Sequence, residues 1–233
     1  MTGRNNIDLV SGTPARTKEP YECQRSRQMK NPIIAAIEGR VSTNLFDAEK
    51  ALTDEQIEEL TRLATRAPTA YNLQNWRFIA VRTAEAKARL RAAAYGQAKV
   101  TEAAVTYIVC GQLPSHTVVD GRLRPSVEAG FMPATMVGAW AEAVESTYSD
   151  NPQMQRDEAV RTATLGAAFL MFAAEAYGLA TGPMVGFDPT AVARQFGLAA
   201  DDIPVVLIAV GYAREGNWPQ KPRLPVSRVL ETL

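Results

Sequence analysis

The stretch Ala67-Pro68-Thr69-Ala70-Tyr71-Asn72-Leu73-Gln74-Asn75-Trp76 is the most informative part of this chain. Pro68 predicts the end of the preceding helix, because proline lacks a backbone N–H and its ring clashes with the previous helical turn. Asn72 and Gln74 then present two primary amides, each with a donor pair and an acceptor. Such side chains suit a planar heterocycle whose edge mixes N–H and C=O groups. The alternative is that these amides bind their own backbone, which is common in loops.

Helical signals flank this stretch. Thr53 and Gln56 form a capping-box pattern, in which each side chain can accept a hydrogen bond from the other residue's backbone N–H. The helix that begins there ends before Pro68, and a longer apolar pattern ends at Gly178, which can supply a left-handed residue. The periodicity predicts helices at 32–38, 54–67, 84–94, 134–145 and 156–177, and a short helix capped by Asp188.

Short apolar runs between these helices predict strands at 76–81, 104–110 and 204–210. Residues 113–130 contain Pro114, Gly121 and Pro125, which predicts a loop. The segment after Ala213 has no clear period and is expected to form an extended arm. Helices and strands alternate irregularly and without a repeat. This order predicts an α+β fold, with an α/β-type mixed sheet flanked by helices.

Composition excludes several classes of protein. Lys plus Arg and Asp plus Glu both number 25, so no basic excess favours nucleic-acid binding. Hydrophobic residues make up 46% of the 233, which predicts a packed core. Residues 1–30 are polar and are expected to be a flexible leader or arm, and 31–233 a single domain. Without a continuous apolar segment of membrane-spanning length, we expect no membrane contact and a cytoplasmic location.

The sequence lacks the residues that several kinds of catalytic centre require. His116 is the only histidine, and Cys23 and Cys110 are the only cysteines, so a nucleophile–histidine relay, a disulfide scaffold and a metal site are all disfavoured. Cys110 lies in an apolar run and is expected to be a small buried hydrophobe. No Gly-x-Gly-x-x-Gly or phosphate-loop motif is present. We therefore expect no metal site. In an enzyme whose bound cofactor carries the chemistry, which the resemblance described next implies, no catalytic side chain is expected either.

The opening stretch, preceded by Gly39-Arg40-Val41-Ser42-Thr43-Asn44-Leu45-Phe46, resembles the nitroreductase family of FMN-dependent oxidoreductases. Further matches are Gly178-Leu179 with Val185-Gly186-Phe187-Asp188-Pro189, and Lys221-Pro222-Arg223. The resemblance runs from Asn31 to about Leu224. It implies a sheet flanked by helices and an intertwined homodimer that exchanges C-terminal arms. A small-sided long helix and an aperiodic tail fit that picture.

The resemblance also implies which residues bind FMN. They lie in four stretches: Arg40, Val41, Ser42 and Asn44; Pro68, Thr69, Ala70, Asn72 and Gln74; Pro183, Met184, Val185 and Gly186; and Lys221 and Arg223. Each stretch has a simpler alternative. In order, these are a surface arginine with a turn serine, loop amides that bind their own backbone, an ordinary glycine turn and a solvated basic tail. On the substrate side we expect Phe131, Met132, Trp140 and Tyr148, for which core packing is the alternative.

Four residues depart from the family's pattern, of which Asn75, in place of the usual proline before Trp76, is a minor case. The family commonly has a basic residue where Val41 stands, and Arg or Lys near the flavin N1–O2 edge where Asn44 stands. Val185 replaces a Gly or Glu near N5. Stabilisation of a reduced, anionic flavin is therefore expected to be weaker or to come from elsewhere.

The function implied is an FMN-dependent oxidoreductase. NADH or NADPH would pass hydride to flavin N5 and leave, and a nitroaromatic, a quinone or a similar acceptor would then take its place in a ping-pong cycle. Other reactions of the same superfamily are alternatives, namely flavin destruction, reductive dehalogenation and dehydrogenation. A flavin-binding store or sensor without turnover is a further alternative, motivated by Val41 and Asn44.

Overall fold

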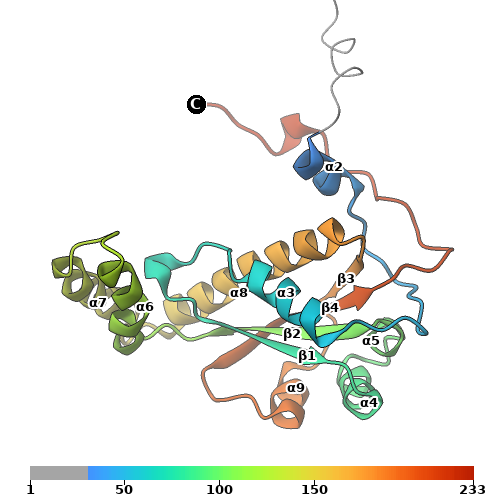
Figure 1. Cartoon of the computed structure of the whole chain (residues 1–233), viewed down its shortest axis with the longest axis horizontal. Helices are drawn as coiled ribbons and strands as arrows, with labels where there is room; N and C mark the ends of the chain where they lie inside the picture. The colour runs from blue at the N-terminus through green and yellow to red at the C-terminus, as the bar shows by residue number, and fades with distance from the viewer. Residues whose placement is uncertain (1–30) are drawn as a thin grey trace, which may run out of the picture. The chain divides into compact units, whose positions relative to one another are not determined.

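A four-stranded antiparallel sheet in the order β1-β2-β4-β3 lies at the centre of the protein (Figure 1). The strands are β1 (Trp76–Val81), β2 (Val105–Gln112), β3 (Ala180–Met184) and β4 (Asp202–Gly211). This computed structural model describes residues 31–233, and the expected leader at 1–30 lies outside them. Each pair of neighbouring strands runs antiparallel, and an isolated bridge between Ser42 and Thr181 is parallel.

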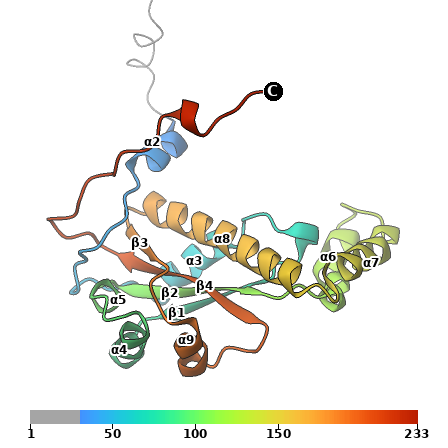
Figure 2. The same ribbon diagram turned by 180° about the vertical axis from the view of Figure 1, so that it is seen from behind.

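Helices cover both faces of the sheet. The helices α3 (Asp54–Ala64) and α8 (Pro152–Ala176) pack on one face, whereas α4 (Ala84–Ala93), α5 (Lys99–Glu102) and α9 (Pro189–Phe196) pack on the other (Figure 2). The central strand β2 contributes side chains to the cores on both faces, because successive side chains of a strand point to opposite faces. Tyr107 and Val109 belong to the core under α8, and Ile108 and Cys110 to the core over α4 and α9. The predicted α+β class is confirmed.

The predicted helix boundaries arise from the expected local interactions. In α3 the backbone N–H of Gln56 donates to Thr53 Oγ1 (3.2 Å), and that of Thr53 donates to Gln56 Oε1 (2.9 Å), which completes the capping box. Asp188 Oδ1 caps α9 by accepting from the backbone N–H groups of Thr190 (2.9 Å) and Ala191 (3.0 Å), and Gly197 ends the helix with a φ of 60°. Gly178 follows α8 with a φ of 68°, as predicted.

Three predictions about secondary structure were wrong. Residues 113–130 form a 3-10 turn, η2 (His116–Val118), and the helix α6 (Val119–Glu128), not a loop. Pro125 lies inside α6, where it removes a hydrogen bond, but Val119 and Leu123 are buried and their packing offsets that cost. β3 was not predicted, since it contains Gly182 and Pro183. Finally, α8 begins at Pro152, four residues before the predicted start, because Asn151 caps it.

A small third cluster joins α6 to α7 (Thr135–Tyr148). Its buried members come from both helices and from the loop before β1: Leu73, Val119, Leu123, Val144 and Tyr148. These two helices lie at the end of the sheet where β2 finishes (Figure 1). The loop that contains the candidate amides is therefore attached to a separate helical pair and to the main sheet.

The small side chains of α8 allow a close approach to the sheet. A Cβ at Gly166 would lie 2.9 Å from the Phe78 ring of β1, and one at Gly111 of β2 would overlap the backbone carbonyl of Ala159. The opposite face of α8 exposes Leu165, Phe169 and Phe172. By length and composition α8 could span a membrane, but a core helix passes the same test, and its contacts with the sheet identify it as one.

Gly111→Ala should destabilise the fold by about 1–3 kcal/mol or more, because the overlap with Ala159 involves backbone atoms that cannot rotate away. Gly138→Ala in α7 is the matched control. A Cβ there meets nothing within 4 Å, so that variant should gain about 0.5–1 kcal/mol. Denaturant unfolding of both variants measures the difference. Equal stability of Gly111→Ala and the parent chain would contradict the close packing of α8.

Candidate functional site

The loop from Arg40 to Phe46 lies along the edge strand β3. The backbone N–H of Thr43 donates to the carbonyl of Thr181 (2.8 Å), and Ser42 forms the parallel bridge to the same residue. A Cβ at Gly182 would overlap the carbonyl oxygen of Thr43, so this approach requires glycine. Two of the predicted stretches, 40–44 and 183–186, are thereby brought together.

The start of the C-terminal tail holds the same loop in place. Asn217 Oδ1 accepts from the backbone N–H groups of Asn44 (2.8 Å) and Leu45 (3.0 Å), and its Nδ2 donates to the Leu45 carbonyl (2.8 Å). Gln220 Nε2 donates to the Arg40 carbonyl (3.1 Å). Lys221 and Arg223 therefore follow directly after residues that contact the predicted phosphate loop. Sequence reasoning missed Asn217, because nothing local marks it.

Lys99 is a further residue that the sequence did not reveal. Its Nζ donates to Asn44 Oδ1 (3.1 Å), although the two residues are 55 positions apart. Burial lowers the pKa of the Lys99 ammonium, and the positive charge of Lys221 lowers it further. A cation thus lies beside Asn44, at the position where the sequence alone appeared to lack positive charge. We call Arg40, Lys99, Lys221 and Arg223 the basic cluster.

Arg40 has an incomplete set of partners. Among residues 31–233 its buried Nη1 atom has no hydrogen-bond partner, and neither has the buried hydroxyl of Thr181. A guanidinium does not lose its proton, so the charge has to be compensated in another way. Arg223 instead donates to the Lys221 carbonyl (3.0 Å) and to Gln220 Oε1 (3.1 Å) within the tail. The basic cluster is therefore suited to bind an anion.

The third stretch continues from β3. Pro183 and Met184 are the last residues of that strand, on the edge of the sheet where a proline is tolerated. Val185 is 77% exposed and Gly186 is exposed beside it. Gln97 Nε2 donates to the Gly186 carbonyl (2.8 Å), which ties this turn to the segment that contains Lys99.

The loop from Pro68 to Gln74, which we call the amide loop, is strained. Tyr71, Asn72 and Gln74 have φ values of 50°, 53° and 48°, a region that non-glycine residues seldom adopt. Gln74 N donates to Thr69 Oγ1 (3.1 Å), and Gln74 Nε2 donates to Asn72 Oδ1 (3.3 Å). The two amide side chains therefore bind each other, whereas the alternative had them bind the backbone of their own loop. Strain of this kind clusters at binding sites, where surrounding contacts maintain it.

The four residues predicted on the substrate side lie on or near α7 but differ in exposure. Phe131 is 85% exposed, whereas Met132 and Trp140 are half-buried against the cluster of α6 and α7. Tyr148 is only 5% exposed, so core packing describes it better than substrate contact. The Tyr71 and Trp140 rings meet edge to face, with centroids 5.9 Å apart. Trp140 is thus in contact with the amide loop.

Within one chain the basic cluster and the amide loop lie at opposite ends of the sheet (Figures 1 and 2). Ser42 bridges Thr181, which pairs through Val210 with Val105 at the start of β2. The amide loop leads into Trp76, which pairs with Gly111 near the other end of β2. The six residue-to-residue steps from Val105 to Gly111 correspond to about 20 Å at ~3.4 Å per step. One chain therefore cannot bring the two groups into direct contact.

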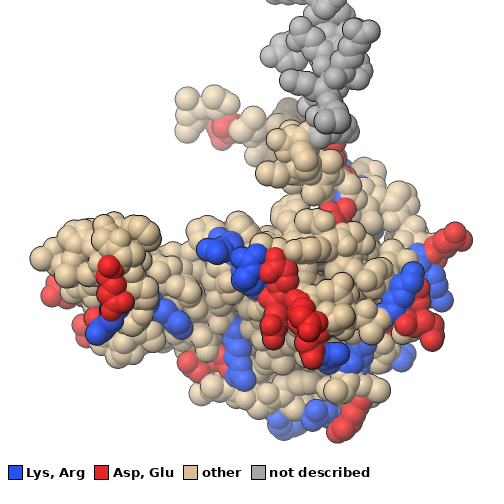
Figure 3. Space-filling view, viewed as in Figure 1, with Lys and Arg blue, Asp and Glu red and all other residues tan. Residues whose placement is uncertain are grey.

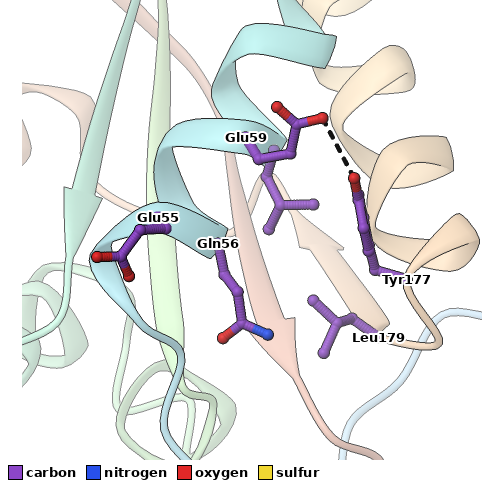
Figure 4. Close-up of a pocket in the computed structure, with 6 residues that line it drawn as sticks. Glu55, Gln56, Glu59, Tyr177 and Leu179 are labelled. Carbon is purple, nitrogen blue, oxygen red and sulfur yellow. Dashed lines mark hydrogen bonds between the residues drawn. The ribbon is translucent and has the colours of Figure 1, made fainter.

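A pocket of about 160 Å³ lies elsewhere, between the start of α3 and the end of α8 (Figure 4). It is lined by Glu55, Gln56, Glu59, Leu60, Tyr177 and Leu179, none of which is a predicted site residue. Acidic side chains gather over α3 on this face (Figure 3). The Arg62 guanidinium lowers the pKa of Glu59, which also accepts from Tyr177 (3.2 Å), so this carboxylate stays ionised and is a poor proton donor.

The sequence profile of the nitroreductase family matches residues 37–212. The chain belongs to the nitroreductase family. It is therefore an oxidoreductase, and the resemblance noted in its sequence is confirmed.

Three similar proteins illustrate the relationship. YodC of Bacillus subtilis, whose name is that of an NAD(P)H nitroreductase, is 31% identical over 84% of this chain and 96% of its own length. An NADH dehydrogenase of Thermus thermophilus is 34% identical over 75% of this chain and 83% of its own. A nitroreductase of Exiguobacterium sibiricum, crystallised in complex with FMN, superposes with a TM-score of 0.80 at 26% identity, over 88% and 99% of the two chains.

Proposed function

We propose that this protein is an FMN-dependent oxidoreductase that uses NADH or NADPH to reduce nitroaromatics, quinones or similar small acceptors. Membership of the nitroreductase family supports the reaction class. The names of YodC and of the Thermus thermophilus relative support a nicotinamide donor, and the FMN complex of the structural neighbour supports the cofactor. A cytoplasmic location is part of this proposal and agrees with a buried Cys110 that forms no disulfide within residues 31–233.

The residues of the chain fit FMN. The unpartnered Nη1 of Arg40 supports this assignment, because a phosphate oxygen would supply the missing acceptor. Ser42, Lys221 and Arg223 would complete the phosphate and ribityl contacts, and Val41 would lie beside them. When bound, FMN would take up hydride from the donor and pass reducing equivalents to the acceptor. No pyrophosphate-binding loop is present, which favours FMN over FAD.

The remaining residues would orient the flavin ring and set its electrostatic surroundings. The primary amides of Asn72 and Gln74 offer both donors and acceptors to the edge of a planar ring. Pro68, Thr69 and Ala70 shape the loop that presents them. The exposed turn of Pro183, Met184, Val185 and Gly186 offers its backbone to the ring. Lys99 would place positive charge near Asn44, which weakens the case for a flavin store without turnover.

The distance between the two halves of the site supports a homodimer. An isoalloxazine held by the amide loop and a phosphate held by Arg40 of the same chain would be separated by about 20 Å of strand. We infer that each flavin is shared, with the two halves contributed by different copies. The tail supports this inference, since Leu224, Val226, Val229 and Leu230 are at least 63% exposed and need a surface to cover them. The exposed apolar face of α8 offers one.

Arg40→Ala should weaken FMN binding by about 1.5–3 kcal/mol, or roughly 10- to 150-fold, because it removes a charge-assisted contact to phosphate. Titration of the apoprotein with FMN, followed by fluorescence quenching, measures the dissociation constant. Arg82→Ala is the control, since Arg82 pairs with Asp54 on the surface and should leave FMN affinity unchanged. If Arg40→Ala binds FMN as tightly as the parent chain does, the assignment of the phosphate site is wrong.

Deletion of residues 224–233 should abolish the dimer and flavin binding together. This truncation keeps Asn217, Lys221 and Arg223, so it spares the basic cluster while it removes the exposed apolar part of the tail. Sedimentation and bound-flavin absorbance on the same sample measure both properties. Deletion of 231–233 is the control and should preserve both. The shared site is refuted by a truncated monomer that still holds one FMN per chain, and the role of the arm is refuted by a truncated dimer.

A further inference from the structure

A chain of contacts leads from the amide loop to a buried carboxylate on α8. The ring of Tyr71 contacts that of Trp140 on α7, with the planes at 77°. Eight residues later in the same helix, the hydroxyl of Tyr148 donates to Glu158 Oε2 (3.2 Å). The loop, α7 and α8 are thereby linked through side chains that the proposed reaction does not use.

Glu158 is an unusual residue at its position. It is 2% exposed, and Asp202 is the other buried carboxylate among residues 31–233. Asp202 serves the sheet, where it binds Arg77 of β1 and Gln112 of β2. Glu158 instead accepts from Thr162 Oγ1 (3.2 Å), pairs with Arg161 and holds Tyr148. Burying a charge costs free energy unless it is well partnered, and here part of the partnership is the link to α7.

The amide loop depends on the pair α6 and α7 for its shape. Leu73 packs with Val119, Leu123, Val144 and Tyr148, and Asn72 Nδ2 donates to the Arg122 carbonyl on α6 (3.4 Å). The left-handed conformation of Tyr71 persists only while such contacts maintain it. A movement of α7 would therefore change both the position of Trp140 beside the loop and the conformation of the loop.

We propose that Glu158 is a positioning residue that, through Tyr148, fixes α7 and Trp140 against Tyr71 and so sets the size of the acceptor admitted beside the amide loop. This inference rests on the proposed function for its reference to an acceptor. Burial raises the pKa of Tyr148 to about 12, and the negative charge of Glu158 contributes, so the hydroxyl keeps its proton and remains a donor at ordinary pH. The anchor is therefore expected to be permanent and to set specificity.

Tyr148→Phe tests the anchor, because it removes the hydroxyl and keeps the ring. Tyr107→Phe is the matched control: Tyr107 is also buried, but its hydroxyl donates to the Ile57 carbonyl (3.1 Å) in the core under α8. Amide hydrogen exchange, read by mass spectrometry, should increase about fivefold or more across 119–148 in Tyr148→Phe, the order of one net hydrogen bond. The control should leave that segment unchanged.

The second readout is the ratio of kcat/KM for a bulky quinone to that for a small nitroaromatic. Tyr148→Phe should raise this ratio about fivefold, chiefly through KM, and Glu158→Ala should do the same. Glu158→Gln keeps an acceptor for Tyr148 and should stay near the parent value. The proposal is overturned if exchange in 119–148 is unchanged in Tyr148→Phe, or if exchange rises while the ratio does not. Hydrogen exchange needs no flavin, so failure of the anchor is distinguishable from failure of the proposed function.

Discussion

The close approach of α8 to the sheet is the interaction on which the rest of the structure depends. Gly111 of the sheet lies against Ala159 of α8, and Gly166 of α8 leaves room for the Phe78 ring, so the 25-residue helix lies directly on β1 and β2. Dense packing of this kind leaves little freedom in the position of the strands. Because the sheet is packed directly against α8, its two ends stay at a fixed distance, and each end carries a different part of the candidate site.

This separation explains features that are otherwise unconnected. One end gathers cations from segments far apart in the sequence, and the other holds a strained loop with two amides. A single ligand that uses both would have to be contacted by two copies of the chain. The proposed dimer would also account for the tail, whose apolar side chains are exposed after its anchor at Asn217. In the proposed dimer, the exposed face of α8 and the tail would both be buried against a second copy.

The sequence predicted those parts of the structure that local chemistry determines. The Thr53 capping box, the helix end before Pro68 and the left-handed Gly178 each depend on a few neighbouring residues. β3 was missed because Pro183 and Gly182 are poor strand residues, tolerated only at an edge and against the Thr43 carbonyl. α6 was missed because the burial of Val119 and Leu123 outweighs the cost of Pro125 inside the helix. Lys99 could not be identified, since its role arises only when the chain brings it to Asn44. The predicted binding residues were chosen by resemblance, and their roles remain predictions.

The central claim is that this chain binds FMN and accepts electrons from a reduced nicotinamide. It is tested most directly by recording the visible spectrum of the purified protein without oxygen, before and after addition of NADH or NADPH. We predict a yellow protein that one of the two donors bleaches rapidly, with recovery of the colour when a quinone or nitroaromatic is added. A protein that stays colourless with added FMN, or a yellow protein that neither donor bleaches, would contradict the account.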